Sequence, residues 1–176
     1  MVLISPVEAW EHSRVNWAPM IKIRIIVVDR TRSPFLAEGE AFYFKRLQHY
    51  AQAEWIEVKP VKMTKGRPEE EILNLEGQAL IRKRAPKDYL VVLDRSGRQY
   101  ASEEFASRLE KVALNASGGI TFMIGGPLGL SRDVLAAADE ILSLSKFTLT
   151  HEMSRVILLE QIYRAFTILK GEKYHK

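Results

Sequence analysis

The stretch ITFMIGGPLGLS, residues 120–131, joins a short apolar run to a glycine-rich segment that ends on a serine. A brief run of apolar and β-branched residues predicts a strand buried on both faces. Ser131 can cap a helix that we expect to run through Ala138, because a serine hydroxyl accepts a hydrogen bond from the first helical turn. A strand, a glycine loop and a capped helix in this order bring bare backbone close to a ligand, since glycine has no Cβ to block its approach.

The glycine loop alone admits two interpretations. The spacing of Gly125, Gly126 and Gly129 is not the G-x-G-x-x-G dinucleotide fingerprint, and no Lys-Ser/Thr pair follows as in a Walker loop. A tight structural turn fits these glycines as well as a ligand loop does. Leu128 and Leu130 make the segment more apolar than a phosphate cradle, which favours an adenosine or thioether ligand over a triphosphate.

Outward from this stretch, strand and helix patterns alternate. The patterns predict strands at residues 21–28, 54–61, 89–93, 120–124 and 140–144, and helices at residues 36–50, 68–84, 131–138 and 153–170, with a further helix capped by Ser102. This alternation predicts an α/β fold on a mainly parallel sheet flanked by helices. The last helix is apolar nearly all round, so we expect it to be covered on most sides, and a partner subunit is a natural source of that cover.

Length and composition indicate one globular domain. The chain has 176 residues, of which 47% are hydrophobic and 27% charged. Residues 1–19 form an extension of open role, and residues 20–176 form the domain, because Met20 opens a strong strand signal. The absence of cysteine excludes a disulfide framework, a thiolate nucleophile and a cysteine-ligated zinc. Four scattered histidines predict no metal site, and no apolar run approaches the roughly 18 residues of a membrane span.

Charge permits a nucleic-acid partner without requiring one. The formal net charge is +4 and the pI is about 9.3. Residues 164–176 hold four Lys and Arg against the single carboxylate of Glu172, a local balance of +3. A solubilising tail and an RNA-contacting tail both explain this balance.

Four segments together resemble a known family: FMIGGPLGLS at 122–131, LSLSKFT at 142–148, RVILLEQIYRAF at 155–166 and GEKYHK at 171–176. They are similar to the bacterial large-subunit ribosomal RNA methyltransferase H family, of the SPOUT class. The resemblance covers Met20–Lys176. It implies an α/β fold with a C-terminal trefoil knot, a cytoplasmic homodimer, and S-adenosylmethionine as methyl donor. It further implies N3-methylpseudouridine in 23S rRNA as the product. Knots are rare enough that periodicity could not have predicted one.

The resemblance also assigns residues to the cofactor. These lie at the end of one strand, in the glycine loop and in the loop before the last helix: Leu93, Gly125, Gly126, Leu144, Ser145, Lys146, Phe147, Thr148 and Leu149. Three loops at strand ends can enclose adenine with apolar groups and offer backbone atoms to its edge. The sequence departs from the family at Thr150, where proline is usual, at Lys173, again in place of proline, and at Leu128, where an acidic or polar residue is common.

Methyl transfer to an imide nitrogen requires positioning and the loss of a proton, and four residues are candidates for these tasks. His151 and His175 are the candidate bases. Arg155 is a candidate for stabilising an oxyanion or holding a phosphate, and Tyr174 for stacking on a base. A purely structural role is the alternative for each. A domain of 176 − 19 = 157 residues offers little surface for reading a long RNA, so we expect the substrate to be an assembled ribosome.

Three other functions compete with this hypothesis. A SPOUT methyltransferase acting on tRNA is disfavoured by the intact Tyr-His-Lys ending. A catalytically silent adenosine or RNA binder would bind the cofactor and transfer nothing. A dinucleotide oxidoreductase is disfavoured by the missing G-x-G-x-x-G.

Overall fold

A computed structural model describes residues 21–175, and the extension expected at residues 1–19 lies outside this part of the chain. The elements follow one another as β1 (Lys22–Val28), α1 (Pro34–Leu47), β2 (Gln52–Val58), α2 (Glu69–Lys83), β3 (Tyr89–Arg98), α3 (Ser102–Asn115), β4 (Ile120–Ile124), α4 (Arg132–Ala136), β5 (Glu140–Leu142), α5 (His151–Leu169) and a short 3-10 helix η2 (Lys173–His175). Among these helices, none is both long and apolar enough to cross a membrane.

The five strands form one parallel sheet in the order β2-β1-β4-β3-β5. Ile25 of β1 pairs with Trp55 of β2 on one side and with Phe122 of β4 on the other, so β1 and β4 are central. Because every strand runs in the same direction, their carboxyl ends lie along one edge of the sheet. The α/β fold with a mainly parallel sheet is confirmed, while the trefoil knot stays a prediction.

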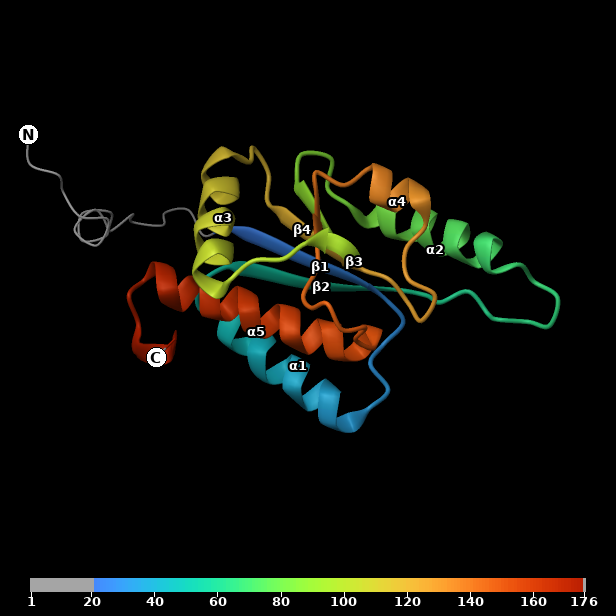
Figure 1. Ribbon diagram of the computed structural model, residues 1–176, viewed down its shortest axis with the longest axis horizontal. Helices are drawn as coiled ribbons and strands as arrows, with labels where there is room; N and C mark the ends of the chain where they lie inside the picture. The colour runs from blue at the N-terminus through green and yellow to red at the C-terminus, as the bar shows by residue number, and fades with distance from the viewer. Residues whose placement is uncertain (1–20, 176) are drawn as a thin grey trace, which may run out of the picture.

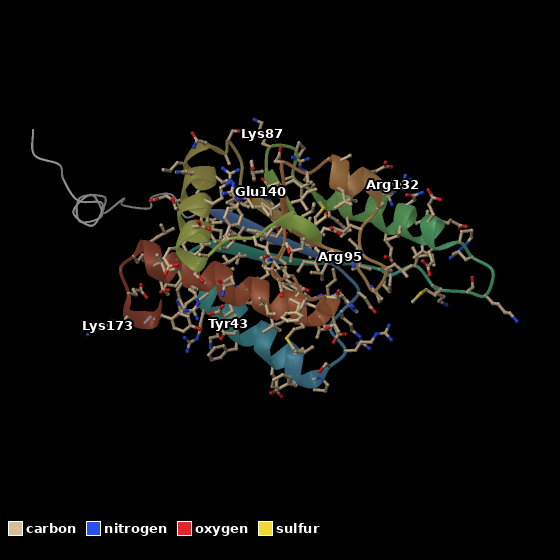
Figure 2. The ribbon with its side chains drawn as sticks, viewed as in Figure 1. Tyr43, Lys87, Arg95, Arg132, Glu140 and Lys173 are labelled. Carbon is tan, nitrogen blue, oxygen red and sulfur yellow. The ribbon has the colours of Figure 1, made fainter. Side chains whose placement is uncertain are left out.

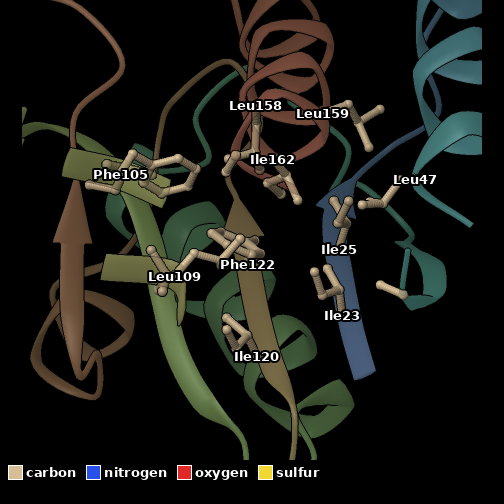
Figure 3. Close-up of a cluster of buried hydrophobic side chains, with 14 of the residues drawn as sticks. Ile23, Ile25, Leu47, Phe105, Leu109, Ile120, Phe122, Leu158, Leu159 and Ile162 are labelled. Atoms are coloured by element: carbon tan, nitrogen blue, oxygen red, sulfur yellow. The ribbon is translucent and has the colours of Figure 1, made fainter. Parts of the chain in front are cut away.

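Helices cover both faces of the sheet, and Figure 1 shows α2 and α4 on one side and α1 and α5 on the other. The face of α1, α3 and α5 carries the larger core, where Leu158, Leu159 and Ile162 of α5 pack above β1 and β4 (Figure 3). Leu80 of α2 and Val134 of α4 pack against the opposite face. Central strands buried on both faces explain why their sequences are continuous apolar runs.

Strand β3 contains an irregular excursion at Asp94-Arg95-Ser96-Gly97, a run of residues that is typical of a turn. Leu93 and Arg98 both pair with Leu142 of β5, so the four residues between them leave the ladder. Within the excursion, the Asp94 carboxylate accepts hydrogen bonds from the backbone N–H and the hydroxyl of Ser96. The predicted strand 89–93 therefore begins at the correct residue, but its predicted end is wrong, because pairing with β5 resumes at Arg98.

The helix caps confirm some predictions and correct others. Ser131 caps α4 as predicted, since its hydroxyl accepts from the backbone N–H of Val134. Ser102 is not a cap: α3 begins at Ser102 itself, and its N-cap is Ala101, whose N–H donates to the carboxylate of Glu104. Helix α5 begins two residues earlier than predicted because Thr150 accepts from Met153 N–H. Thr150, a departure from the family pattern, thus ends the preceding loop with a cap.

Asp88, at the start of β3, is the most connected buried carboxylate at the amino edge of the sheet. It accepts from Gly119 N–H at 2.8 Å, from the Thr121 hydroxyl at 2.7 Å and from the guanidinium of Arg24. Burial alone would raise the pKa of Asp88, but these three donors outweigh it and lower the pKa below its usual 3.8. Asp88 therefore ties β1, β3 and β4 together through its ionised form.

Asp88→Ala should lower the free energy of unfolding by about 3 kcal/mol at pH 7. The substitution leaves the partly buried Arg24, the Gly119 N–H and the Thr121 hydroxyl without their shared acceptor. Glu54→Ala is the matched control, since Glu54 also pairs with Arg24 but its side chain is 57% exposed; it should cost under about 1 kcal/mol. Urea denaturation measures both. The stabilisation by Asp88 is present above its unfolded pKa and is lost as the pH falls through its lowered folded pKa. Equal losses in the two variants would contradict this assignment.

Candidate active site

A pocket of about 880 Å³ opens at the carboxyl edge of the sheet. Three segments that leave β3, β4 and β5 form its walls, and the first turn of α5 closes one side. This is where parallel α/β sheets bind their ligands, because the loops there face a common crevice. The pocket is lined by Leu93, Asp94, Arg95, residues 124–130, residues 142–145, Phe147, Thr148, Leu149, Thr150, His151 and Ser154.

The glycine loop after β4 depends on the lack of a side chain at two positions. A Cβ on Gly125 would lie 2.1 Å from the carbonyl oxygen of Gly129, so only glycine fits there. Gly129 has φ +91°, a conformation that favours glycine, and its N–H donates to the Gly126 carbonyl at 3.0 Å. A Cβ on Gly126 would instead point away, toward Val28 at 3.3 Å and Glu76 at 3.4 Å. The loop is thus a closed backbone turn on one wall of the pocket.

The loop between β5 and α5 is held by its own serines. The Ser143 hydroxyl donates to the Ser145 carbonyl, and the Ser145 hydroxyl accepts from Phe147 N–H, each at 3.0 Å. These bonds present Phe147 with 83% of its surface exposed at the pocket. Lys146 points elsewhere: it is exposed and does not line the pocket.

His151 is the first residue of α5 and lines the pocket. Burial lowers its pKa below the usual 6.5, and the positive charge of Arg155 lowers it further. A lowered pKa keeps the imidazole neutral at pH 7, which is the form that accepts a proton. His151 thus lies in the pocket with a lowered pKa, while its role as a base stays a prediction.

Arg155 lies behind the pocket wall and is fully buried. Its guanidinium donates to the Val28 carbonyl at 2.6 Å and to the Thr31 hydroxyl at 2.8 Å. Four carboxylates, those of Glu40, Glu152, Glu57 and Asp29 in decreasing order, oppose the lowering of its pKa by burial. The guanidinium contacts the end of β1 and the β1–α1 connection, and it does not line the pocket. In this arrangement Arg155 does not reach a substrate directly, and the role that remains for it is to position the start of α5.

A second tie joins α5 to the same connection. The carboxylate of Glu152 accepts from the backbone N–H groups of Arg32 at 2.9 Å and Ser33 at 3.2 Å. Asp29, at the end of β1, holds a positive φ of 64°, which is uncommon for a residue other than glycine. Hydrogen bonds therefore attach the first turn of α5 to the segment that follows β1, beside the pocket.

The C-terminal tail lies at the other end of α5. The ring of Tyr174 packs edge-on against Tyr163 at 4.8 Å between centroids, with the guanidinium of Arg164 5.0 Å from its centroid. Figure 2 shows Lys173 beside Tyr43 and remote from Arg95 at the pocket. The 19 residues of α5 span about 28 Å at 1.5 Å per residue. Tyr174 is thus not in its own chain's pocket, and the side chain of His175 lies outside the described part of the structure.

The pocket gathers eight of the nine residues expected at the cofactor; the ninth, Lys146, does not line it. Sequence reasoning missed several lining residues, among them Asp94, Arg95 and Ser154. The turn signature at residues 94–97 was visible, but nothing in it indicated that the turn faces the glycine loop. Ser154 lies three residues after His151 and so on the same face of the helix. The choice of His151 as a candidate could therefore have predicted Ser154 as a second lining residue.

A second hollow, of about 900 Å³, lies between α3 and β5. Its charges neutralise one another: Glu140 accepts from Tyr100 at 2.7 Å and from Arg108 at 2.8 Å. This network fixes α3 on the edge strand, and none of the residues expected at the cofactor lies there.

Comparison with known proteins places the chain. A family profile described as "Predicted SPOUT methyltransferase" matches residues 21–175. "Ribosomal RNA large subunit methyltransferase H" of Streptococcus pneumoniae strain CGSP14 is 40% identical over 159 residues, which are 89% of this chain and 100% of that protein. The same protein from strain TIGR4 gives the same values.

A solved structure, that of a probable methylase family protein from Haemophilus influenzae Rd KW20, shares the fold with a TM-score of 0.51 at 15% identity, covering 88% of this chain and 70% of that one. The parallel sheet, the pocket at its carboxyl edge and the full-length similarity agree. The chain belongs to the SPOUT methyltransferase family and, within it, to the family of ribosomal RNA large subunit methyltransferase H.

Proposed function

We propose that this protein transfers a methyl group from S-adenosylmethionine to N3 of a pseudouridine in 23S rRNA, on the assembled ribosome and as a homodimer. The observation that carries the proposal is the convergence of eight expected cofactor residues on one pocket at the carboxyl edge of the sheet. The relatives that are similar over their full length bear the name of a large-subunit rRNA methyltransferase.

The pocket suits an adenosine ligand with a thioether-like arm. Its volume falls within the roughly 300–1,000 Å³ typical of small-molecule sites. Apolar side chains of Leu93, Leu144 and Leu149 line it beside the bare backbone of the glycine loop. S-adenosylmethionine, when bound, supplies an electrophilic methyl group on a sulfonium sulfur. Closely apposed backbone amides and carbonyls can then recognise the adenine edge without a charged side chain.

His151 is the residue in the pocket best suited to accept the N3 proton. It lines the pocket, and its lowered pKa keeps it in the accepting form at neutral pH. His175 remains the alternative base, from a second copy of the chain.

Arg155 acts as a positioning residue in this proposal. It holds α5, and with it His151, on the Val28 carbonyl at the end of β1. The loss of such a support displaces a reacting group without removing it, and a displacement of about 1 Å can cost roughly 100-fold in rate.

The homodimer supplies what one chain lacks. Phe35 and Phe42 on α1 are 77% and 50% exposed, and α1 packs against α5, where Val156 and Ile157 are half-buried. Exposed large apolar side chains are typical of an interface. The tail of one chain lies about 28 Å from its own pocket, by the length of α5. We therefore propose that Tyr174 and His175 act at the pocket of the partner, so that a monomer is inactive.

The test of this function uses methyl-labelled S-adenosylmethionine with ribosomes that lack the modification and with the same rRNA stripped of protein. We expect label on ribosomes, mapping to a pseudouridine of 23S rRNA, and none on naked rRNA. Label on naked rRNA alone would contradict the need for an assembled substrate. Cofactor binding without any transfer would favour a silent binder or a tRNA enzyme.

Gly125→Ala should weaken binding of S-adenosylmethionine by roughly 100-fold, because the new Cβ would collide with the Gly129 carbonyl and displace the loop by about an ångström. Gly126→Ala, whose Cβ meets only a methyl of Val28 at 3.3 Å and the Glu76 carboxylate at 3.4 Å, is the matched control. It should change affinity by less than about threefold. Calorimetric titration measures both, and thermal unfolding checks that each variant is folded. An unchanged affinity in Gly125→Ala would remove the glycine loop from the binding site.

The acid limb of single-turnover methylation should have its midpoint below pH 6.5, because burial and the charge of Arg155 lower the pKa of His151 from that usual value. His151→Asn should be slower by roughly 100- to 10,000-fold and should lose this acid limb, with cofactor affinity unchanged. If both proteins instead gained tenfold in rate per pH unit from 6 to 8, the proton would be lost to solvent and His151 would not be the base.

A further inference from the structure

The connection between β2 and α2 concentrates positive charge. Residues 59–68, KPVKMTKGRP, carry Lys59, Lys62, Lys65 and Arg67 and no acidic residue, a local charge of +4. We call this segment the basic arm. Ten residues thus hold as much excess charge as the whole chain, whose 26 Lys and Arg face 22 Asp and Glu. All four cations are exposed.

The basic arm has a defined shape. Arg67 donates from its backbone to the Thr64 carbonyl at 3.1 Å and from its guanidinium to the Lys62 carbonyl at 3.3 Å. Gly66, with φ +91°, permits this turn. At the base, Val61 N–H donates to the carboxylate of Glu76 at 2.9 Å, and Glu76 is buried on α2. The lysines are therefore displayed from a fixed turn.

The base of the basic arm adjoins the pocket. Glu76, which anchors Val61, also lies next to Gly126, since a Cβ built there would be 3.4 Å from its carboxylate oxygen. The basic arm leaves the carboxyl end of β2, on the edge where the pocket opens, and Figure 1 shows it extending beyond the start of α2.

Three of the four charges are available to a ligand. Within residues 21–175, no carboxylate lies within 4.0 Å of the ammonium of Lys59, Lys62 or Lys65, whereas Arg67 pairs with Glu71 at 3.2 Å. Glu69, Glu70 and Glu71 occupy the first turn of α2, where they complement the helix dipole. The lysines lie before this acidic turn and carry no complementary partner of their own.

We infer that the basic arm binds the phosphate backbone of rRNA beside the target nucleotide. The inference rests on the proposed function and adds to it the surface by which a small domain holds a large RNA. Lysine contacts phosphate as a flexible point charge, which positions an RNA without reading its sequence. Among the described residues, three lysines of the basic arm have no carboxylate within 4.0 Å, and the arm is fixed at its base beside the pocket. Contact with phosphate explains this arrangement better than solvation alone.

The test compares two triple variants with equal loss of charge. The first is Lys59→Gln/Lys62→Gln/Lys65→Gln in the basic arm. The control is Lys22→Gln/Lys87→Gln/Lys111→Gln, three exposed lysines, of which Lys22 is the first residue of β1, Lys87 precedes β3 and Lys111 lies on α3. Steady-state methylation of unmodified ribosomes is measured from 50 to 200 mM KCl, and S-adenosylmethionine affinity is measured separately.

We expect the arm variant to raise KM for ribosomes by roughly 10- to 100-fold and to flatten the slope of log affinity against log salt by about 2 to 3, one phosphate per lysine. Cofactor affinity and the control variant should match the unchanged protein. An unaltered KM, an unaltered salt slope, or the same effect in the control would each overturn the inference. Methylation of ribosomes by the unchanged protein would still support the proposed function in each of these cases. A raised KM with the salt slope intact would indicate contact with a ribosomal protein and also overturn it.

Discussion

The hydrogen bond from the buried guanidinium of Arg155 to the Val28 carbonyl, 2.6 Å long, is the contact on which the site depends. It joins the start of α5 to the end of the central strand β1, and the Thr31 hydroxyl and the Glu152 carboxylate extend the same junction to the start of α1. A charge taken out of water is costly unless it is paired or hydrogen-bonded, and here two hydrogen bonds and the attraction of four carboxylates offset part of that cost. The wall of the pocket that carries His151 is therefore attached directly to β1.

The remaining walls follow from the parallel sheet. Because β3, β4 and β5 are parallel neighbours, the three segments that follow them begin at the same edge of the sheet. The sheet itself therefore brings these segments together. Local chemistry then shapes each one: an aspartate turn after Leu93, a glycine turn after Ile124 and a pair of serine bonds after Leu142. Hydrogen bonds within each segment fix its shape, and Asp94 and Arg95 bring one negative and one positive side chain to the pocket. Ligand binding and RNA binding are thus assigned to neighbouring surfaces, joined through Glu76.

Much of this could be predicted from the sequence, and the failures have physical causes. The apolar runs predicted all five strands, and residues 120–124 carry the predicted bounds because buried strands have no polar face to blur them. The end of β3 and the cap of α3 were wrong because they depend on pairing with β5 and on a backbone donor at Ala101 that no side chain signals. The cofactor residues were predicted by family resemblance, and only the structure separates Lys146 from its neighbours. Arg155 shows the limit most clearly: a motif identifies an arginine but not which way its side chain points. Residues 59–61 of the basic arm were predicted as the end of a strand, whereas β2 ends at Val58. The significance of the basic arm lies in its position at the pocket edge, which the sequence does not give.

If the carboxyl-edge pocket, and not the hollow between α3 and β5, receives the cofactor, ligand binding should perturb the pocket residues selectively. The direct measurement is a titration of the ¹⁵N-labelled protein with S-adenosylhomocysteine, followed through backbone amide chemical shifts. The account predicts that the large shifts fall in residues 93–95, 124–130 and 142–151, the three segments and the helix start that form the pocket. Large shifts centred on Arg98, Ser107 and Lys111, with the glycine loop unmoved, would contradict it.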